Sequence, residues 1–130
     1  MLDDKLVSGL DLVTIQLSEN ANDLQSFKSD MEDLIKHVKE KCGSSIKIII
    51  IDDFWSEEKS EIKKLVANES GIDFVDLSDI RNNIVYQLGI GSIIYDENGN
   101  KHVNQHSGVA VHPNDEGMKI IAERVLEKIK

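Results

Sequence analysis

The chain has 130 residues, of which 40% are hydrophobic and 30% are charged, and its formal net charge is −9. This length and composition predict a single soluble domain that can bury a core without disulfides or structural metals. The acidic balance repels phosphate backbones, so nucleic acid is excluded as an expected partner. No apolar run approaches the roughly 20 residues needed to span a bilayer, so no membrane partner is expected either.

The N-terminus and the cysteine content bear on localisation. The first ten residues, MLDDKLVSGL, are acidic and lack the basic and apolar regions of a signal peptide. Cys42 is the only cysteine and cannot form an internal disulfide, which fits a reducing compartment. We therefore expect a cytoplasmic location for the chain as it stands, while secretion stays open if an N-terminal segment is missing.

Strand and helix patterns alternate from the start of the chain. Residues 11–17 (DLVTIQL) are apolar and partly β-branched, which predicts a strand. Residues 23–42 carry apolar side chains at helical spacing, which predicts an amphipathic helix. Asn22 or Asp23 can cap the start of this helix, and Gly43 can end it.

The same alternation continues to residue 80. Residues 45–55 hold an unbroken apolar run, as expected for a strand covered on both faces by helices. Residues 56–71 predict a shorter amphipathic helix, whose charges EEKSEIKK we expect to face solvent. Residues 72–80 predict a third strand. The residues expected on the inner face of the second helix are Ile62, Leu65 and Val66.

The last third of the chain predicts a hairpin and a helix. Residues 92–106 form two partly alternating arms around Asn98-Gly99, a pair typical of hairpin turns. The final helix is expected to begin near Asn114. The order β-α-β-α-β-hairpin-α predicts a parallel sheet with helices packed on it. The apolar face of the last helix is expected to comprise Met118, Ile121, Ala122, Val125 and Ile129.

His112 precedes Pro113, which is the only proline in the chain. Proline disfavours the helical region for the residue before it, so His112 lies on a stiff corner. Asn114 can cap the following helix, and Asp115 and Glu116 complement its dipole. A histidine held in this way suits a general base. The alternative is a simple turn before a helix, with a solvated imidazole.

Two stretches together resemble the SGNH (GDSL-type) hydrolase family. Residues 111–125, VHPNDEGMKIIAERV, resemble its last block, in which a histidine followed by proline opens the final helix and acts as the catalytic base. Residues 11–23, DLVTIQLSENAND, resemble its third block, in which an asparagine amide donates to the oxyanion. The resemblance implies that His112 is the base and Asn20 an oxyanion donor.

The resemblance also implies the fold and its extent. Residues 1–130 would form one α/β domain, similar to the C-terminal two-thirds of an SGNH hydrolase. The implied architecture is three-layer α/β/α with a parallel sheet, flavodoxin-like, lacking its first strands. In complete relatives the substrate would be a small acyl ester or an O-acetyl carbohydrate.

The chain departs from the family pattern at several points. The Gly-Asp-Ser block with the nucleophile and the second block with the oxyanion glycine have no counterpart here. Ser18 stands where the third block has glycine, and Val109 occupies the usual position of the triad acid. Loss of the acid can cost about 10⁴ in rate, and no acyl-enzyme forms without a serine. We therefore expect an incomplete esterase that is weak or inactive.

No other residue is expected to replace the nucleophile or to bind a cofactor or metal. Ser8, Ser18 and Ser107 each suit a turn or loop hydroxyl better than a nucleophile, which needs a constrained turn. His102 and His106 are four residues apart, but on an extended hairpin arm such residues lie far from each other.

Two other functions remain open. The first is a non-catalytic α/β binding or assembly module. The second is a receiver-like phosphoacceptor, because IIIIDDFW places Asp52 and Asp53 directly after an apolar strand. The alternative for these aspartates is that they cap the turn near Trp55.

The predicted sheet also bears on self-association. A chain that begins at the family's third strand would leave residues 11–17 at an open edge, and exposed apolar edges tend to pair. We expect a homo-oligomer formed through this strand, with pairing across a two-fold axis as the simplest geometry.

Overall fold

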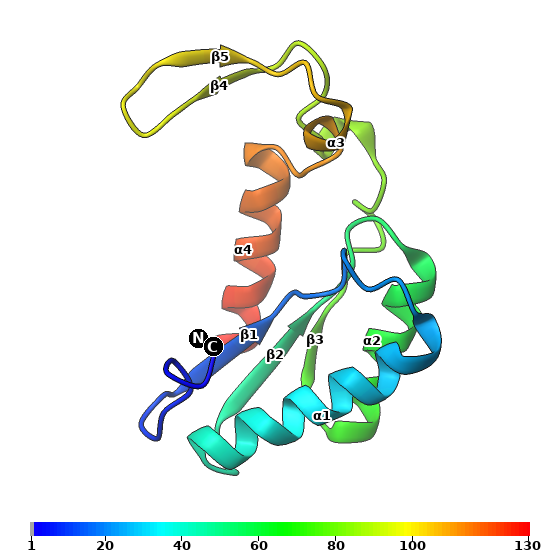
Figure 1. Cartoon of the computed structure of the whole chain (residues 1–130), viewed down its shortest axis with the longest axis vertical. Coiled ribbons are helices and arrows are strands. Elements are labelled where there is room, and N and C mark those ends of the chain that lie inside the picture. Colours follow the sequence, from blue (N-terminus) through cyan, green and yellow to red (C-terminus); the bar gives the residue numbers. More distant parts are fainter. Residues whose placement is uncertain (1) are drawn as a thin grey trace.

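A parallel sheet of three strands, in the order β1-β2-β3, forms the centre of the computed structural model, which describes residues 2–130. The strands are β1 (Leu12–Ile15), β2 (Lys47–Ile51) and β3 (Asp73–Val75). Helices α1 (Leu24–Cys42) and α2 (Glu57–Ser70) connect them (Figure 1). The predicted α/β alternation and parallel pairing are therefore confirmed, although all three strands are shorter than the sequence indicated.

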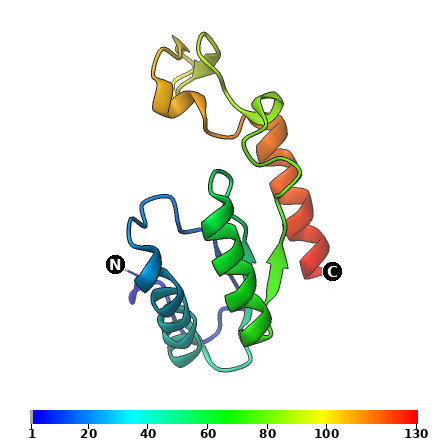
Figure 2. The ribbon, with the colours of Figure 1, turned by 90° about the vertical axis from the view of Figure 1, so that its right-hand side faces the viewer.

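Helices cover both faces of the central strand, as its apolar run predicts. Ile48 and Ile50 of β2 pack in one core with α1 and α2, and Ile49 and Ile51 pack in a second core with α4 (Asp115–Ile129). Figure 2 shows α1 and α2 on one side of the strands and α4 on the other. All four isoleucines are buried, so β2 is the best-enclosed strand of the sheet.

The ends of α1 and α2 follow the capping signals in the sequence. The Asp23 side chain accepts a hydrogen bond from the amide of Gln25, and α1 ends at Gly43, whose φ of 104° suits glycine. Ser56 caps α2 through the amide of Lys59. The predicted caps of α1 are confirmed.

Leu77 and Ile80, which follow β3, pack in the second core, and the chain between them and α4 then projects away from the sheet (Figures 1 and 2). It contains a 3₁₀ turn η1 (Ile84–Tyr86), strands β4 (Ile93–Tyr95) and β5 (Lys101–Val103), and the short helix α3 (Ser107–Ala110). β4 and β5 pair antiparallel, so the predicted hairpin is confirmed. We call residues 88–106 the arm.

Two predicted helix faces are partly wrong. In α2, Leu65 is 45% exposed, whereas Lys63 is fully buried. In α4, Ile121 is buried as expected, but Met118 and Ile129 are about half exposed and Ala122 is also exposed. The error in α4 has a structural cause, because α4 packs over β2 and β3, and the core on that side includes only Leu12 of β1.

β1 forms one edge of the sheet, as expected. Among the described residues, its only strand partner is β2, and its burial falls well below that of β2. None of the helices in residues 2–130 has the apolar length that a membrane span requires.

Candidate functional site

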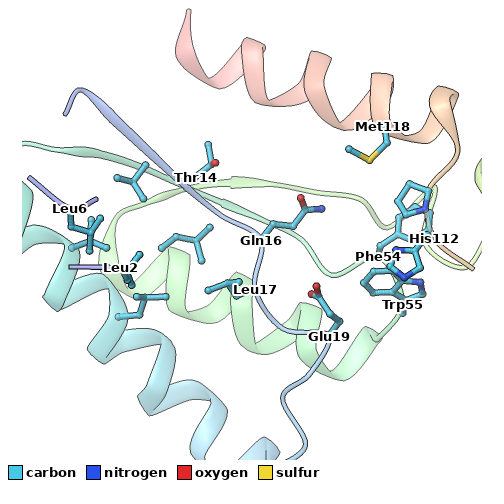
Figure 3. A pocket seen from close by; sticks show the side chains of 15 residues that line it. Leu2, Leu6, Thr14, Gln16, Leu17, Glu19, Phe54, Trp55, His112 and Met118 are labelled. Carbon is cyan, nitrogen blue, oxygen red and sulfur yellow. The ribbon is translucent and has the colours of Figure 1, made fainter. Parts of the chain in front are cut away.

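A cavity of about 470 Å³ runs along the open edge of β1 (Figure 3). Its walls are largely apolar and come from the N-terminal segment, β1 and α1. Its far end lies beyond the carboxyl ends of the strands, where ligand sites of parallel sheets usually occur. The residues at that end are Gln16, Glu19, Phe54, Trp55, His112, Pro113 and Met118.

His112 lies at this end of the cavity, on the corner before α4. The amide of Leu88 donates to the carbonyl of His112 (2.9 Å), and the amide of His112 donates to the carbonyl of Val109 (3.1 Å). These two bonds and the proline fix the backbone of the corner. The predicted stiff corner is therefore seen in the structure.

Trp55 holds the same corner from the other side. Its ring packs edge-on against the His112 imidazole, with ring centroids 5.3 Å apart. Its indole Nε1 donates to the carbonyl of Val111 (3.0 Å). Trp55 thus links the loop after β2 to the loop before α4. Sequence reasoning treated Trp55 only as a neighbour of a turn, and no spacing signal joins residues so far apart.

The start of α4 is held against the turn η1. The Asn114 side chain accepts from the amide of Gly117 (2.9 Å) and donates to the carbonyls of Val85 and Gln87. A side-chain carbon at Gly117 would lie 2.8 Å from the carbonyl oxygen of Tyr86, so glycine permits this close approach. The predicted capping role of Asn114 is confirmed.

Within residues 2–130, no acid and no other side chain forms a hydrogen bond with the imidazole of His112, and Val109 lies in α3 with an apolar side chain. The carboxylate that shares the cavity is Glu19. It lies in the loop after β1 and was not singled out from the sequence.

Asn20 lies in the loop after β1 and lines a neighbouring cavity of about 280 Å³. Leu17, Glu19 and Leu34 line both cavities. The structure therefore brings Asn20 and His112 to the same end of the sheet, in adjoining cavities rather than in one.

None of the candidate serines is placed to act with His112: Ser18 is hydrogen-bonded elsewhere, and Ser8 and Ser107 lie in other segments. Ser18 is buried and donates its hydroxyl to Asp53, and its carbonyl accepts from Nζ of Lys59 (2.7 Å). Ser8 is exposed in the N-terminal segment, and Ser107 is the first residue of α3. None of the three hydrogen-bonds to the imidazole of His112.

Asp52 anchors a buried ionic network behind the cavity. Its carboxylate accepts from the amide of Leu77 (3.0 Å) and from Nη2 of Arg81 (2.6 Å). Arg81 also donates to the hydroxyl of Ser60 (2.6 Å) and, through Nε, to the carbonyl of Asp53 (3.0 Å). Asp52 is 1% exposed, so this ion pair is shielded from solvent.

Asp53 caps the turn that leads into α2, as the turn interpretation predicts. Its Oδ1 accepts from the amides of Trp55 (2.8 Å) and Ser56 (2.6 Å), and its Oδ2 accepts from Ser18. Burial raises the pKa of this carboxyl, but the hydrogen bonds and the charge of Lys63 outweigh burial and hold the pKa below its usual value of 3.8. Both oxygens are thus occupied.

Lys63 is the buried cation of this region. Its Nζ donates to the carbonyl of Ile51 (2.9 Å), and burial lowers its pKa to about 8, against the attraction of Asp53 and Asp52. The burial of Lys63 was not predicted, because this residue lies in a run of charged residues that indicated a solvent-exposed helix face.

The remaining histidines form local contacts. His102 Nε2 lies 2.9 Å from Oδ2 of Asp96 across the hairpin, and His106 Nδ1 accepts from the amide of Gly108. Within the described part of the chain, no group of three or more potential ligands could hold a metal ion.

The chain was compared with protein-family models, curated proteins and solved structures. None of the three comparisons found a match.

Proposed function

We propose that this chain is an incomplete SGNH-type esterase, which carries the base and the oxyanion-donor end of the site but lacks the nucleophile. The arrangement of α1 and α2 on one face of a parallel sheet and α4 on the other supports the three-layer, flavodoxin-like fold of that family. The open edge of β1 supports the idea that the first strands of that fold are missing.

One observation carries this proposal. His112, fixed by Pro113 and packed against Trp55, lines a cavity at the carboxyl end of the sheet. An imidazole fixed at such a place can accept a proton from a hydroxyl presented on the sheet side of the cavity. Asn20 would polarise the acyl oxygen from the adjoining cavity.

The chemistry of the cavity limits the substrate class. The lining is mostly apolar, with Gln16 and Glu19 as polar groups near His112. An apolar wall fits a short acyl group, and the aromatic rings of Phe54 and Trp55 offer surfaces on which a sugar ring can pack. We propose a small acyl ester or an O-acetyl carbohydrate as the substrate of complete relatives.

A chromogenic acetate ester assay tests the missing nucleophile. We expect the wild-type chain, His112→Ala and the control His102→Ala to hydrolyse the ester at the same background rate, because none of the candidate serines contacts His112. Turnover that is abolished by His112→Ala but kept by His102→Ala would show a nucleophile within this chain. That result would overturn the proposed incompleteness.

Binding of an acetylated sugar tests the proposed relation to SGNH-type esterases. We expect an O-acetylated monosaccharide to shift the NMR signals of the His112 ring and the Trp55 indole N–H, and the matched unacetylated sugar to shift them less. The His102 ring lies on the arm and serves as the internal control. If both sugars leave His112 and Trp55 unchanged, the cavity is not an acyl-sugar site and the proposal fails.

A non-catalytic assembly module is the second candidate. It is supported by the apolar cavity beside the open edge of β1, which suits a polypeptide partner as well as a small molecule. A receiver-like phosphoacceptor has no such support, because both carboxylate oxygens of Asp53 are already bonded within the fold.

A further inference from the structure

The free backbone groups of β1 can be identified from its pairing with β2. The amide of Lys47 donates to the carbonyl of Asp11 (3.3 Å), and the strands pair in parallel with Leu12 opposite Lys47. Alternate residues of a strand direct their N–H and C=O groups to the same side. The backbone groups of Asp11, Val13 and Ile15 therefore face β2.

The backbone groups of the intervening residues face outward. These residues are Leu12, Thr14 and Gln16, and no other strand in residues 2–130 pairs with them. Their N–H and C=O groups form a short ladder of donors and acceptors ready to bind another strand.

β1 itself carries none of the residues that usually protect an edge strand, and Leu2 and Leu6 of the N-terminal segment line the cavity beside it. The sequence of β1, LVTI, contains no charge and no proline, although charges and prolines commonly block edge pairing. The opposite edge strand, β3, is only three residues long and begins with Asp73, which forms an ion pair with Lys47. The two edges thus differ, and β1 is the open one.

Apolar side chains flank this edge on both faces of the sheet. On the α1 side, Val13 and Leu34 are only partly buried and Leu17 is 61% exposed. On the α4 side, Met118 lines the same cavity as Thr14, and it begins an exposed apolar stripe along the helix. The other members of the stripe are Ala122, Leu126 and Ile129.

The accessible surface of the whole chain is large for its size. It measures 8368 Å², whereas a compact monomer of 14.6 kDa exposes about 6,900 Å². The difference is about 1,500 Å². A standard interface removes about 800 Å² from each partner, so the difference exceeds the area that one such interface would cover.

We propose that a second copy of this chain pairs with β1 through its open edge, antiparallel and across a two-fold axis at Thr14. In this register Thr14 faces Thr14 of the second copy, and Leu12 faces Gln16 in both directions. All the outward backbone groups of these residues are then paired, which no register shifted by two residues achieves. On the α1 side, Val13 lies opposite Ile15, so apolar side chains meet.

The edge itself favours a copy of this chain over a charged partner. A two-fold interface must be self-complementary, and a neutral strand with a threonine at its centre places no like charges on the axis. The two sheets would join into one of six strands and bring together the apolar flanks of both copies. This inference comes from the sheet and does not depend on the proposed esterase function.

Sedimentation equilibrium of the full chain, from micromolar to millimolar concentration, tests the proposal. We expect a reversible monomer–dimer equilibrium. Thr14→Pro should weaken dimerisation at least about tenfold, since each copy loses an outward hydrogen bond at the axis. Thr14→Lys, which places like charges on the axis, should have the same effect if the proline variant does not fold.

The control is Ile84→Lys, which adds the same charge at an apolar residue that is 81% exposed and remote from the edge. It should leave the dimer intact. Amide hydrogen exchange tests the proposed register of the two strands. The N–H groups of Leu12, Thr14 and Gln16 should become protected from exchange as the protein concentration rises. A monomer at every concentration, open-ended oligomers, a dimer that survives Thr14→Lys, or one lost in Ile84→Lys would each overturn the proposal.

Discussion

At the carboxyl end of the sheet, the polar groups beyond β2 and β3 differ from those beyond β1 in their burial and hydrogen bonding. Beyond β2 and β3, Asp52, Asp53 and Lys63 are buried and Arg81 is largely covered, and their charged groups are bonded to one another or to backbone groups. Beyond β1, His112 is exposed beside a cavity, and no side chain of the described residues hydrogen-bonds to its ring.

This difference separates stability from function. A buried charge with all its partners in place has no capacity left for a ligand, and removing a partner is costly. An exposed imidazole on a fixed corner keeps its capacity to bind or to exchange a proton. The paired aspartates after β2 are therefore a misleading sign of a ligand site in this chain. The histidine before the proline remains a useful sign of one.

The largest expected effect concerns the buried ion pair. Arg81→Ala leaves the carboxylate of Asp52 buried without its cation, which should lower the free energy of unfolding by about 3–5 kcal/mol. Urea denaturation monitored by circular dichroism measures the loss. The matched control is Arg124→Ala, which breaks the more exposed pair with Asp79 and should cost less than about 1 kcal/mol. Equal losses would show that burial does not set the cost of breaking an ion pair in this region.

An intermediate effect concerns Lys63 and appears as a pH dependence. Its folded-state pKa of about 8 lies below the usual 10.5, so the unfolded chain binds more protons at this site between these values. The free energy of unfolding should therefore rise with pH across this window, on the order of 3 kcal/mol relative to Lys63→Met. Below pH 8 the cost of burying the charge is fully present.

The control for this profile is Lys36→Met, which removes an exposed lysine of α1. Its denaturation profile should run parallel to that of the wild type between pH 7 and the upper end of the window. A Lys63→Met profile that is also parallel to the wild type would show that Lys63 is not held with a lowered pKa.

The smallest expected effect lies on the cavity side. Trp55→Phe keeps an aromatic ring against His112 but removes the indole N–H bond to Val111, which should cost about 1 kcal/mol of stability. The more telling measurement is the NMR signal of the His112 ring, whose position should change as the corner loosens. An unchanged His112 signal would mean that Trp55 does not hold the corner.

The main elements could be predicted because local signals agree with the packing. The four isoleucines of β2 indicate a strand covered on both faces, and Asp23, Gly43 and Asn114 mark the ends of helices by their own chemistry. The open edge of β1 was also expected, and the pairing of the strands confirms it.

The incorrect predictions concern side chains whose burial or contacts depend on residues far away in the sequence. Lys63 is buried because the carboxylates after β2 and the carbonyl of Ile51 receive its charge, and no local pattern reports such distant partners. Met118 and Ile129 look like core residues in the sequence, yet both side chains are about half exposed in the structure. The contact of Trp55 with His112 joins residues 57 positions apart and is invisible to spacing rules.

The backbone bonds at the foot of the arm have a mechanical consequence. Leu88 and Gly89 bind the carbonyls of His112 and Ala110, and the Asn104 side chain donates to Gly89, so the arm and the histidine corner share one rigid joint. The backbone of the corner that carries His112 is therefore attached by hydrogen bonds to a segment that projects from the sheet (Figure 1), so the position of the arm and the position of the corner are fixed together.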